Sequence, residues 1–235
     1  YIYNLRTDKY VHLYSSKDDP YSLSDNAVYS LCEDREGGIW VGSYFGGVDY
    51  YPKSYTYFEK YYPKDGDNNL HGKRVREFCE DNKGILWIGT EDGGLNRFDP
   101  KTKTFSFFAP SFGFTNIHGL CMVGDKLWVG TFSKGLKIVD TNTGNILKTY
   151  QKNDSPRSLI DNSIFAICRT TTGDIYLGTM FGLLRYNEQT DDFDRIEELA
   201  GRFVYDIKED SGGNLWLATY VNGAYSVSYT HLRAH

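Results

Sequence analysis

The sequence lacks several features that define common classes of protein. Its 235 residues include only two Met and six Pro, and no run approaches the ~20 apolar residues that a membrane-spanning helix needs. The 26 Lys and Arg stand against 31 Asp and Glu, and the two signs are interspersed, so we expect no nucleic-acid partner. No signal peptide opens the chain, and its first residue is Tyr1 rather than Met, which predicts a fragment or a mature segment.

The motifs of several enzyme classes are missing as well. The chain has no G-x-S-x-G, no phosphate-binding Gly loop and no H-E-x-x-H, and its five His show no metal-ligand spacing. We therefore expect no catalytic residue, no metal and no cofactor. The full set of residues that a propeller sialidase would need, an Arg cluster with a Tyr nucleophile and an acid, is not visible either. A propeller glycoside hydrolase or lyase remains the alternative of a different class.

The residues that are abundant, 20 Tyr, 14 Phe and 24 Gly, favour strands and turns. They occur in five similar segments, which we align on Trp40, Trp87, Trp128, Tyr176 and Trp216, at intervals of 47, 41, 48 and 40 residues. Each segment has an apolar run, a polar turn, the pattern [IL]-[WY]-[VIL]-[GA]-[ST], a Gly-containing loop and two further strands. In the first copy the predicted strands are 28–33, 39–43, 48–51 and 55–61.

Four short strands in every ~40–50 residues is the period of a β-propeller blade. Residues 39–41 are apolar on both pleat faces, as a strand wedged between two blades requires. The sequence therefore predicts an all-β protein, a β-propeller of four-stranded antiparallel blades. We expect a half-blade at 1–14 and five repeats up to residue 228, together part of a larger propeller, followed by a non-native tail at 229–235.

The pattern E-D-x-x-G-x-[IL]-W-[VI]-G-[ST]-x-x-G-G-[VL] resembles the two-component regulator propeller repeat. The resemblance covers residues 1 to about 228 and is most specific in the first, second and fifth copies. It implies the periplasmic sensor region of a Bacteroidetes hybrid two-component histidine kinase, an inner-membrane protein. It also implies an oligosaccharide ligand, a downstream β-domain and kinase in the same parent chain, and a possible homodimer. The chain itself contains no kinase motif, so the signalling half is implied by the resemblance alone.

Two further patterns have a structural and a functional interpretation. Cys32, Cys79, Cys121 and Cys168 each fall at the end of an innermost strand, and because neighbouring sheets pack ~10 Å apart, we expect buried, unpaired thiols. Residues 65–69, DGDNN, have the oxygen spacing of a calcium loop, but they align with turns in the other copies and lack the Gly and Glu of such a loop. A plain turn is favoured, with calcium as the alternative.

The candidate ligand-binding residues lie in the loops between the second and third strands, on the same face as the connections between blades. Exposed aromatic rings there suit the C–H faces of sugars, and carboxylates and amides suit their hydroxyl groups. The candidates from these loops are Tyr44, Phe45, Asp92, Phe132, Phe181 and Tyr220, and those from the connections are His71, Arg74 and Arg202. The alternatives are that these rings pack on each other or on a neighbouring domain, or that the propeller is a scaffold that binds protein.

Overall fold

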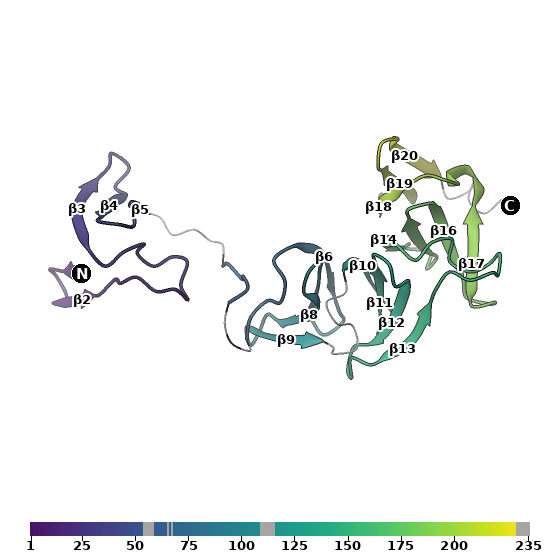
Figure 1. The fold of residues 1–235 in the computed structure, drawn as a ribbon, viewed down its shortest axis with the longest axis horizontal. Coiled ribbons are helices and arrows are strands. Elements are labelled where there is room, and N and C mark those ends of the chain that lie inside the picture. The colour runs from purple at the N-terminus through teal and green to yellow at the C-terminus, as the bar shows by residue number, and fades with distance from the viewer. Residues whose placement is uncertain (54–58, 65, 67, 109–115, 229–235) are drawn as a thin grey trace. The chain divides into compact units, whose positions relative to one another are not determined.

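A computed structural model describes residues 1–53, 59–64, 66, 68–108 and 116–228 (Figure 1). The chain divides into two compact units, residues 1–65 and 66–235. The first unit contains a two-stranded hairpin and a three-stranded antiparallel sheet. Its strands are β1 (Ile2–Asn4), β2 (Lys9–Val11), β3 (Val28–Glu33), β4 (Ile39–Ser43) and β5 (Val48–Tyr51). Three of the four strands predicted for the first copy are thereby confirmed. For the fourth, residues 55–58 lie outside the described residues and residues 59–61 are not in a strand.

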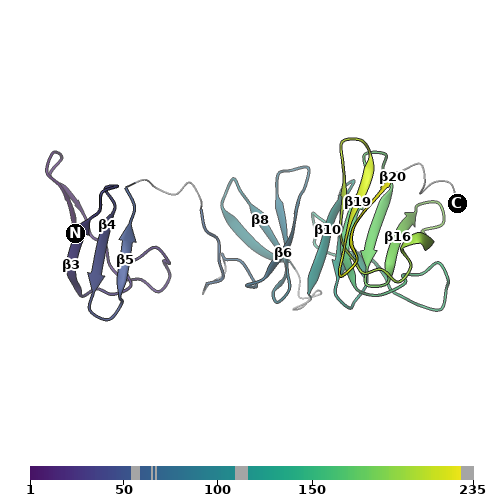
Figure 2. The same ribbon diagram turned by 90° about the horizontal axis from the view of Figure 1, so that it is seen from above.

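The second unit consists of four antiparallel sheets in which strands adjacent in sequence are hydrogen-bonded (Figures 1 and 2). The first sheet has strands β6 (Val75–Glu80), β7 (Leu86–Thr90), β8 (Gly94–Asp99) and β9 (Thr104–Phe108). The second has β10 (Ile117–Val123), β11 (Lys126–Thr131), β12 (Leu136–Asp140) and β13 (Ile146–Tyr150). The third has β14 (Ile164–Arg169), β15 (Ile175–Thr179), β16 (Gly182–Asn187) and β17 (Asp192–Ile196). The last has β18 (Val204–Glu209), β19 (Asn214–Thr219) and β20 (Gly223–Ser228), after the 3₁₀-helix η1 (Glu197–Leu199).

Three of these sheets have four strands and the last has three, and these meanders confirm the predicted propeller fold. The core lies between consecutive sheets. Trp87, Trp128 and Tyr176, the central aromatics of three copies, are almost fully buried, and each packs on apolar residues of the next sheet. A central strand wedged between two blades, as predicted from the sequence, would also bury Trp40 and Trp216; for these two residues the prediction is wrong, because they are 45% and 49% exposed. Each of these two Trp lies in the last sheet of its unit, so no following sheet of that unit covers it. In the described part of the chain, no helix is long and apolar enough to cross a membrane.

The Asp of the E-D turn has a structural role in the repeats that contain it. In the second copy, Oδ1 of Asp81 accepts hydrogen bonds from the amides of Lys83 and Ile85, at 2.8 and 3.1 Å. Its Oδ2 accepts a bond of 3.1 Å from the indole nitrogen of Trp87. Asp34 and Asp210 bond the indoles of their own copies in the same way, at 2.9 and 2.8 Å. The carboxylate therefore joins the turn to the Trp that fills the space between blades.

The pattern [GA]-[ST] also has a physical explanation. A Cβ atom on Gly89 would lie 2.6 Å from Cγ2 of Ile117 in the next sheet, so the inner strands approach more closely there than a side chain allows. The hydroxyl that follows closes the loop after the strand, since Thr90 donates to the carbonyl of Gly94 at 3.1 Å. Thr131, Thr179 and Thr219 close the corresponding loops of their copies. The motif thus sets both the spacing of the blades and the turn between their second and third strands.

The four cysteines are free, as expected. Their expected burial is only partly correct: Cys79, Cys121 and Cys168 are half-buried between sheets, whereas Cys32 is exposed in a sheet that lacks a neighbour in its unit. Burial raises the pKa of the Cys79 thiol to about 12 and that of Cys168 to about 11. These thiols are therefore poor nucleophiles in the folded unit.

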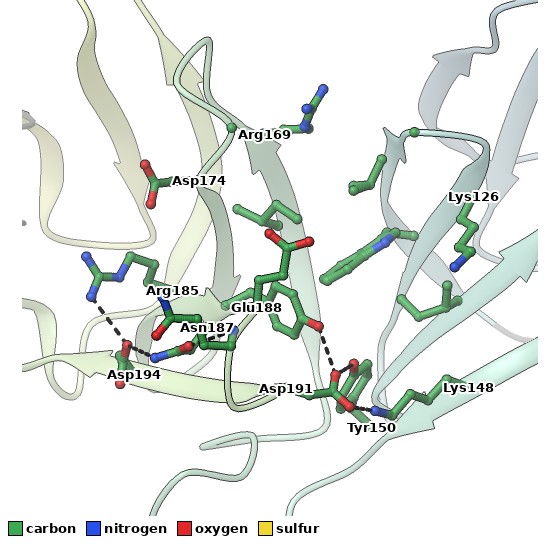
Figure 3. Close-up of a pocket in the computed structure, with 18 of the residues that line it drawn as sticks. Lys126, Lys148, Tyr150, Arg169, Asp174, Arg185, Asn187, Glu188, Asp191 and Asp194 are labelled. Carbon is green, nitrogen blue, oxygen red and sulfur yellow. Dashed lines mark hydrogen bonds and ion pairs between the residues drawn. The ribbon is translucent and has the colours of Figure 1, made fainter.

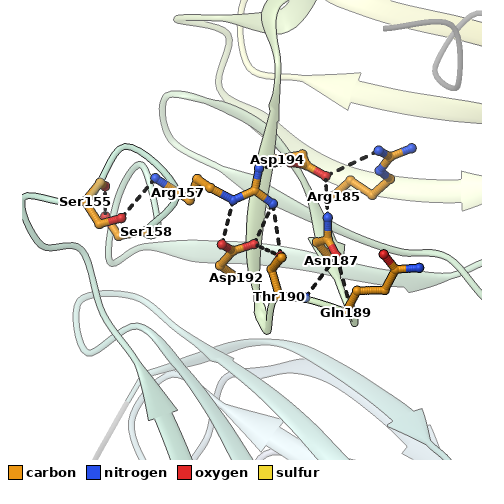
Figure 4. Close-up of polar contacts among 9 residues, drawn as sticks. All are labelled: Ser155, Arg157, Ser158, Arg185, Asn187, Gln189, Thr190, Asp192 and Asp194. Carbon is orange, nitrogen blue, oxygen red and sulfur yellow. Dashed lines mark hydrogen bonds and ion pairs between the residues drawn. The ribbon is translucent and has the colours of Figure 1, made fainter.

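The connection before β14 is held to the outer strand of its own blade (Figure 4). Arg157 makes two hydrogen bonds of 2.6 Å to the carboxylate of Asp192 and an ion pair of 2.9 Å with Asp194. The hydroxyl of Ser158 donates to the carbonyl of Ser155 at 2.8 Å, which closes the turn. This segment aligns with residues 65–69, of which 65 and 67 lie outside the described residues.

Candidate functional site

Each innermost strand carries a β-bulge at its second residue. In all five sheets, the pairing with the second strand shifts between the first and third residues, so that the residue between them has no partner across the ladder. A bulge turns its side chain away from the direction that strand alternation dictates. The residues at this position are Tyr29, Arg76, His118, Phe165 and Tyr205.

In the second unit, four of these residues form a contiguous group, which we call the bulge cluster: Arg76, His118, Phe165 and Tyr205. The guanidinium of Arg76 donates a hydrogen bond to the hydroxyl of Tyr205 and lies 4.9 Å from the centre of its ring. It also lies 3.3 Å from Nδ1 of His118. The His118 ring is 4.8 Å from that of Phe165, which is 5.6 Å from that of Tyr205. The innermost strands of four sheets thus contribute to one cluster.

An acidic group from a loop completes the polar side of the bulge cluster. Oε1 of Glu91, in the loop after β7, lies 3.4 Å from Nε of Arg76, and both side chains are about a quarter exposed. Oε2 of the same carboxylate lies 3.9 Å from the guanidinium of Arg74, whose side chain is 73% exposed. Because Glu91 and Tyr205 both engage Arg76, the guanidinium is held in one orientation.

His118 is the most deeply buried polar member of the bulge cluster, with 7% of its surface exposed. Burial and, secondarily, the charge of Arg76 lower the pKa of His118 to about 4, so the ring is neutral at pH 7. Because a guanidinium can only donate, Nδ1 is the acceptor and the proton lies on Nε2. Among the described residues, neither this buried Nε2 nor the buried Oδ1 of Asn116 has a hydrogen-bond partner. One buried donor and one buried acceptor are therefore unsatisfied among the described residues.

Aromatic rings extend the bulge cluster into the loops, and two predicted residues belong to this extension. Phe132 lies 5.8 Å from His118 and 6.0 Å from Phe165. Phe165 contacts Phe203 at 4.4 Å, and Phe203 contacts Tyr220 at 5.5 Å. Phe132 and Tyr220 are 42% and 63% exposed, so the chain of rings leads from the buried centre to the surface.

The structure gives other predicted residues different partners. Oδ1 of Asp92 accepts hydrogen bonds from the amides of Lys73 and Arg74, at 2.9 and 3.2 Å, and these bonds lower the pKa of the Asp92 carboxyl. Asp92 thus orders the connection that precedes β6. The ring of His71 stacks on Phe107 of the outer strand β9, with 4.5 Å between centroids.

The remaining predicted residues are exposed at loops. The ring of Phe181 is 49% exposed, and its carbonyl accepts a hydrogen bond from the amide of Gly201 at 2.9 Å, next to the exposed Arg202. In the first unit, Tyr44 and Phe45 are 55% and 86% exposed, with 4.3 Å between their rings. Tyr44 also lies 5.0 Å from Tyr29, the bulge residue of that unit.

Sequence reasoning placed the site in the loops and missed the bulge residues. The repeat register contained a signal for them: the position after the first apolar residue of each innermost strand holds Tyr, Arg, His, Phe and Tyr in the five copies. A large or charged residue at this same position in every copy indicates a side chain that leaves the packing between blades. The bulge that turns it towards its equivalents is visible only in the strand pairing.

The bulge cluster offers several kinds of contact to a ligand. Its rings provide stacking faces, Arg76 and Glu91 provide paired charges, and His118 provides a neutral donor. The described residues contain no group of three or more His, Cys, Asp or Glu that could hold a metal ion. The arrangement fits a ligand with hydroxyl groups and C–H faces.

Three segments of the chain match the family model of the two-component regulator propeller: residues 22–45, 69–92 and 198–221. They are the first, second and fifth copies of the repeat. Each match ends in the loop after the second strand, which carries Tyr44, Glu91 or Tyr220. The sequence matches none of the curated proteins.

Solved structures of similar fold include the extracellular domains of two hybrid two-component systems from B. thetaiotaomicron. One is 17% identical, with a TM-score of 0.52 over 93% of this chain and 37% of its own length. The other is 18% identical, with a TM-score of 0.53 over 97% of this chain and 40% of its own. Virginiamycin B lyase from Staphylococcus aureus is 13% identical, with a TM-score of 0.52 over 87% of this chain and 67% of its own. These similarities show the β-propeller fold, and the chain spans well under half of the two extracellular domains.

Proposed function

This chain carries the two-component regulator propeller repeat, and we propose that it is part of an extracytoplasmic sensor domain that binds an oligosaccharide. The extracellular domains of hybrid two-component systems that share its fold support this class of function. In this proposal the parent is an inner-membrane protein. The propeller lies in the periplasm and passes the binding signal through a downstream β-domain to a histidine kinase. The parent acts as a homodimer.

The observation that carries the proposal is the composition of the bulge cluster. A sugar ring has apolar C–H faces and a rim of hydroxyl groups, so it needs stacking surfaces and side chains that can both donate and accept. Phe132 and Tyr220, the exposed rings that extend the cluster, offer such surfaces. Nε2 of His118 and Oδ1 of Asn116 are a buried donor and acceptor without partners among the described residues. Burying such groups unpaired costs roughly 1–3 kcal/mol each, which a hydroxyl-rich ligand would recover.

The test is calorimetric titration of the chain with a panel of plant and host oligosaccharides. We expect at least one to bind, and we expect Tyr220→Ala and Phe132→Ala each to weaken that binding at least fivefold, since each removes a stacking ring worth roughly 1 kcal/mol or more. Tyr10→Ala, an equally exposed ring on β2, is the matched control and should bind normally. Binding that survives both loop substitutions in folded protein would move the site elsewhere.

The rival function, a propeller hydrolase or lyase, is separated by the fate of the ligand. The similarity in fold to virginiamycin B lyase is the observation that favours it. A sensor returns the bound oligosaccharide unchanged, whereas an enzyme releases shorter or unsaturated products. Chromatography of the titrated oligosaccharide after prolonged incubation distinguishes the two functions. If a product forms and its formation is lost in Tyr205→Phe or Arg76→Gln, the protein is an enzyme and the sensor proposal is wrong.

A further inference from the structure

A cavity lies between two blades of the second unit (Figure 3), and no residue of the bulge cluster lines it. It has a volume of about 1060 Å³ and separates the sheet β10–β13 from the sheet β14–β17. We call it the blade wedge. Its walls are the facing sides of the two sheets, and its mouth is formed by the β10–β11, β14–β15 and β16–β17 turns. All of its lining residues belong to the described part of the chain.

Contacts between the two blades border the blade wedge on its inner side, near the innermost strands, and on its outer side, near the outermost strands. On the inner side, the apolar residues of β10 and β14 pack in one cluster with Trp128. On the outer side, Asp191 of the β16–β17 turn receives hydrogen bonds from Tyr186 of its own blade, at 2.8 Å, and from Tyr150 of the neighbouring blade. Lys148 of the neighbouring blade forms an ion pair with the same carboxylate. These contacts border the cavity on its inner and outer sides, and elsewhere it is open to solvent.

Aromatic rings form the floor of the blade wedge. Trp128 and Tyr186, from facing sheets, meet edge to face with 4.9 Å between centroids, and Tyr150 lies 6.2 Å from Tyr186. Ile138 and Ile175 are buried beside them. The bottom of the pocket is thus the edge of the apolar core, with ring surfaces that a ligand can contact.

The mouth of the blade wedge carries nearly balanced charges. The cations among its lining residues are Lys126, Lys148, Arg169 and Arg185, and the carboxylates are Asp125, Asp174, Glu188, Asp191 and Asp194. Several neutralise each other, since Arg185 lies 3.3 Å from Asp194 and Lys148 is paired with Asp191. Figure 3 shows Glu188 reaching from the β16–β17 turn towards the space between the sheets. A strongly charged ligand of either sign would meet as much repulsion as attraction there.

From this combination we infer that the blade wedge is a second binding site, for a neutral oligosaccharide. Its volume is at the upper end of the roughly 300–1,000 Å³ typical of small-molecule sites. The rings at the floor provide stacking surfaces for a sugar. The carboxylates, the amide and the guanidinium groups at the mouth provide paired hydrogen bonds to neighbouring sugar hydroxyls.

The blade wedge is separate from the bulge cluster. His118 is the second residue of β10, whereas Val123, which lines the blade wedge, is its last. Five residues of extended strand span ~16 Å, so the two sites lie at opposite ends of the same innermost strand. Substitutions at one site can therefore test it without altering the other.

The experiment is titration of the chain with maltotriose, cellotriose and xylotriose, followed by saturation-transfer NMR and calorimetry. Glu188 and Arg169 are exposed side chains at the mouth, so Glu188→Ala and Arg169→Ala should leave the fold intact. We expect at least one trisaccharide to bind, and each substitution to weaken it at least fivefold. Lys101→Ala, an exposed change in the corresponding hairpin of the β6–β9 blade, is the matched control and should leave binding unchanged.

Three results would overturn the inference. The first is that none of the three neutral trisaccharides binds. The second is that binding survives Glu188→Ala and Arg169→Ala but is lost in Tyr220→Ala, which would assign it to the bulge cluster. The third is that a charged ligand binds the blade wedge more tightly than the neutral trisaccharides do. The charged ligands to test are a heparin-derived trisaccharide and an unstructured peptide that carries both acidic and basic residues.

Discussion

At the scale of single residues, the indole of each repeat that contains the E-D turn can have two kinds of partner. An aspartate in its own turn fixes the orientation of the ring, as Asp81 does for Trp87 and Asp210 does for Trp216. The apolar face of the following sheet then covers the ring, and this second partner is present for Trp87 but not for Trp216 within the described unit. The same motif therefore yields a core residue in one copy and a half-exposed residue in another.

This difference predicts unequal costs of removing the two rings. Trp87→Ala should lower the free energy of unfolding by ~3–5 kcal/mol, because it leaves a large cavity between β6–β9 and β10–β13. Trp216→Ala should cost clearly less, because half of its ring already faces solvent. Urea denaturation followed by circular dichroism measures both. Equal costs, or an unchanged midpoint for Trp87→Ala, would contradict the packing described above.

The buried His118 predicts a specific pH dependence of stability. The pKa of His118 falls from 6.5 in the unfolded chain to about 4 in the folded unit. Between pH 6.5 and pH 4 the folded state therefore binds fewer protons than the unfolded state does. The stability it contributes is present above pH 6.5 and is lost as the pH falls from 6.5 through 4. Arg76 and Glu91 are the charged groups that face His118.

The measurement is the thermal midpoint of the chain and of His118→Gln between pH 7 and pH 4.5. The midpoint of the original chain should fall more steeply with acid than that of the variant, because Gln cannot take up the proton. Parallel curves would show that His118 is either solvated or already protonated in the folded unit.

At the scale of elements, the second position of each innermost strand differs in role from the positions around it. Residues one and three of the innermost strands pair normally with the second strand, and the bulge between them directs a large side chain towards its equivalents. Close approach of neighbouring sheets is ensured one strand further out, by the Gly of [GA]-[ST]. The blade thus combines a uniform spacing with variable residues at its centre.

The close approach at this Gly predicts which copies tolerate a larger residue. Gly89→Val should destabilise the second unit by roughly 1–3 kcal/mol, because its side chain would overlap Ile117 of the next sheet. Ala218 occupies the corresponding position of β19 and is exposed, so Ala218→Val should change stability by less than roughly 0.5 kcal/mol. Chemical denaturation of both variants checks this. A larger loss for Ala218→Val would mean that a further sheet covers β18–β20.

At the scale of the whole molecule, the candidate aromatic residues are divided between two units. Tyr44 and Phe45 belong to the first, whereas Phe132, Phe181 and Tyr220 belong to the second. Equivalent loops of a propeller emerge on the same face because every blade repeats the same strand path. That a single ligand contacts rings from both units remains a prediction from the repeat.

The double variant Tyr44→Ala/Phe132→Ala tests this prediction in the parent sensor domain. Both rings are exposed, at 55% and 42%, so folding should be retained. Affinity for a bound oligosaccharide should fall by more than either single substitution causes, since each ring contributes roughly 1 kcal/mol of stacking. Calorimetry compares the three variants. Full affinity in the folded double variant would place the site on another face or in blades outside this chain.

The sequence by itself was sufficient to predict the propeller blades, because strands that are adjacent in sequence pair with each other and leave a local, repeating pattern of strand and turn residues. The turn Asp, the central aromatic and the [GA]-[ST] pair recur at a nearly constant period, and they correctly predicted β3, β4 and β5. Phe132 and Tyr220 could also be chosen from the sequence, since exposed rings at loop tips are recognisable without a structure.

Only the tertiary structure decided which side chains meet. Arg76 and Tyr205 are 129 positions apart, and no local pattern indicates that two bulges turn them towards each other. Likewise, Tyr150 and Asp191 close the blade wedge from different sheets, although each lies in an unremarkable outer hairpin of its own copy. The physical reason is that secondary structure follows from neighbours in sequence, whereas a site depends on how separate sheets face one another. The same reason explains why identical motifs left Trp87 buried and Trp216 exposed.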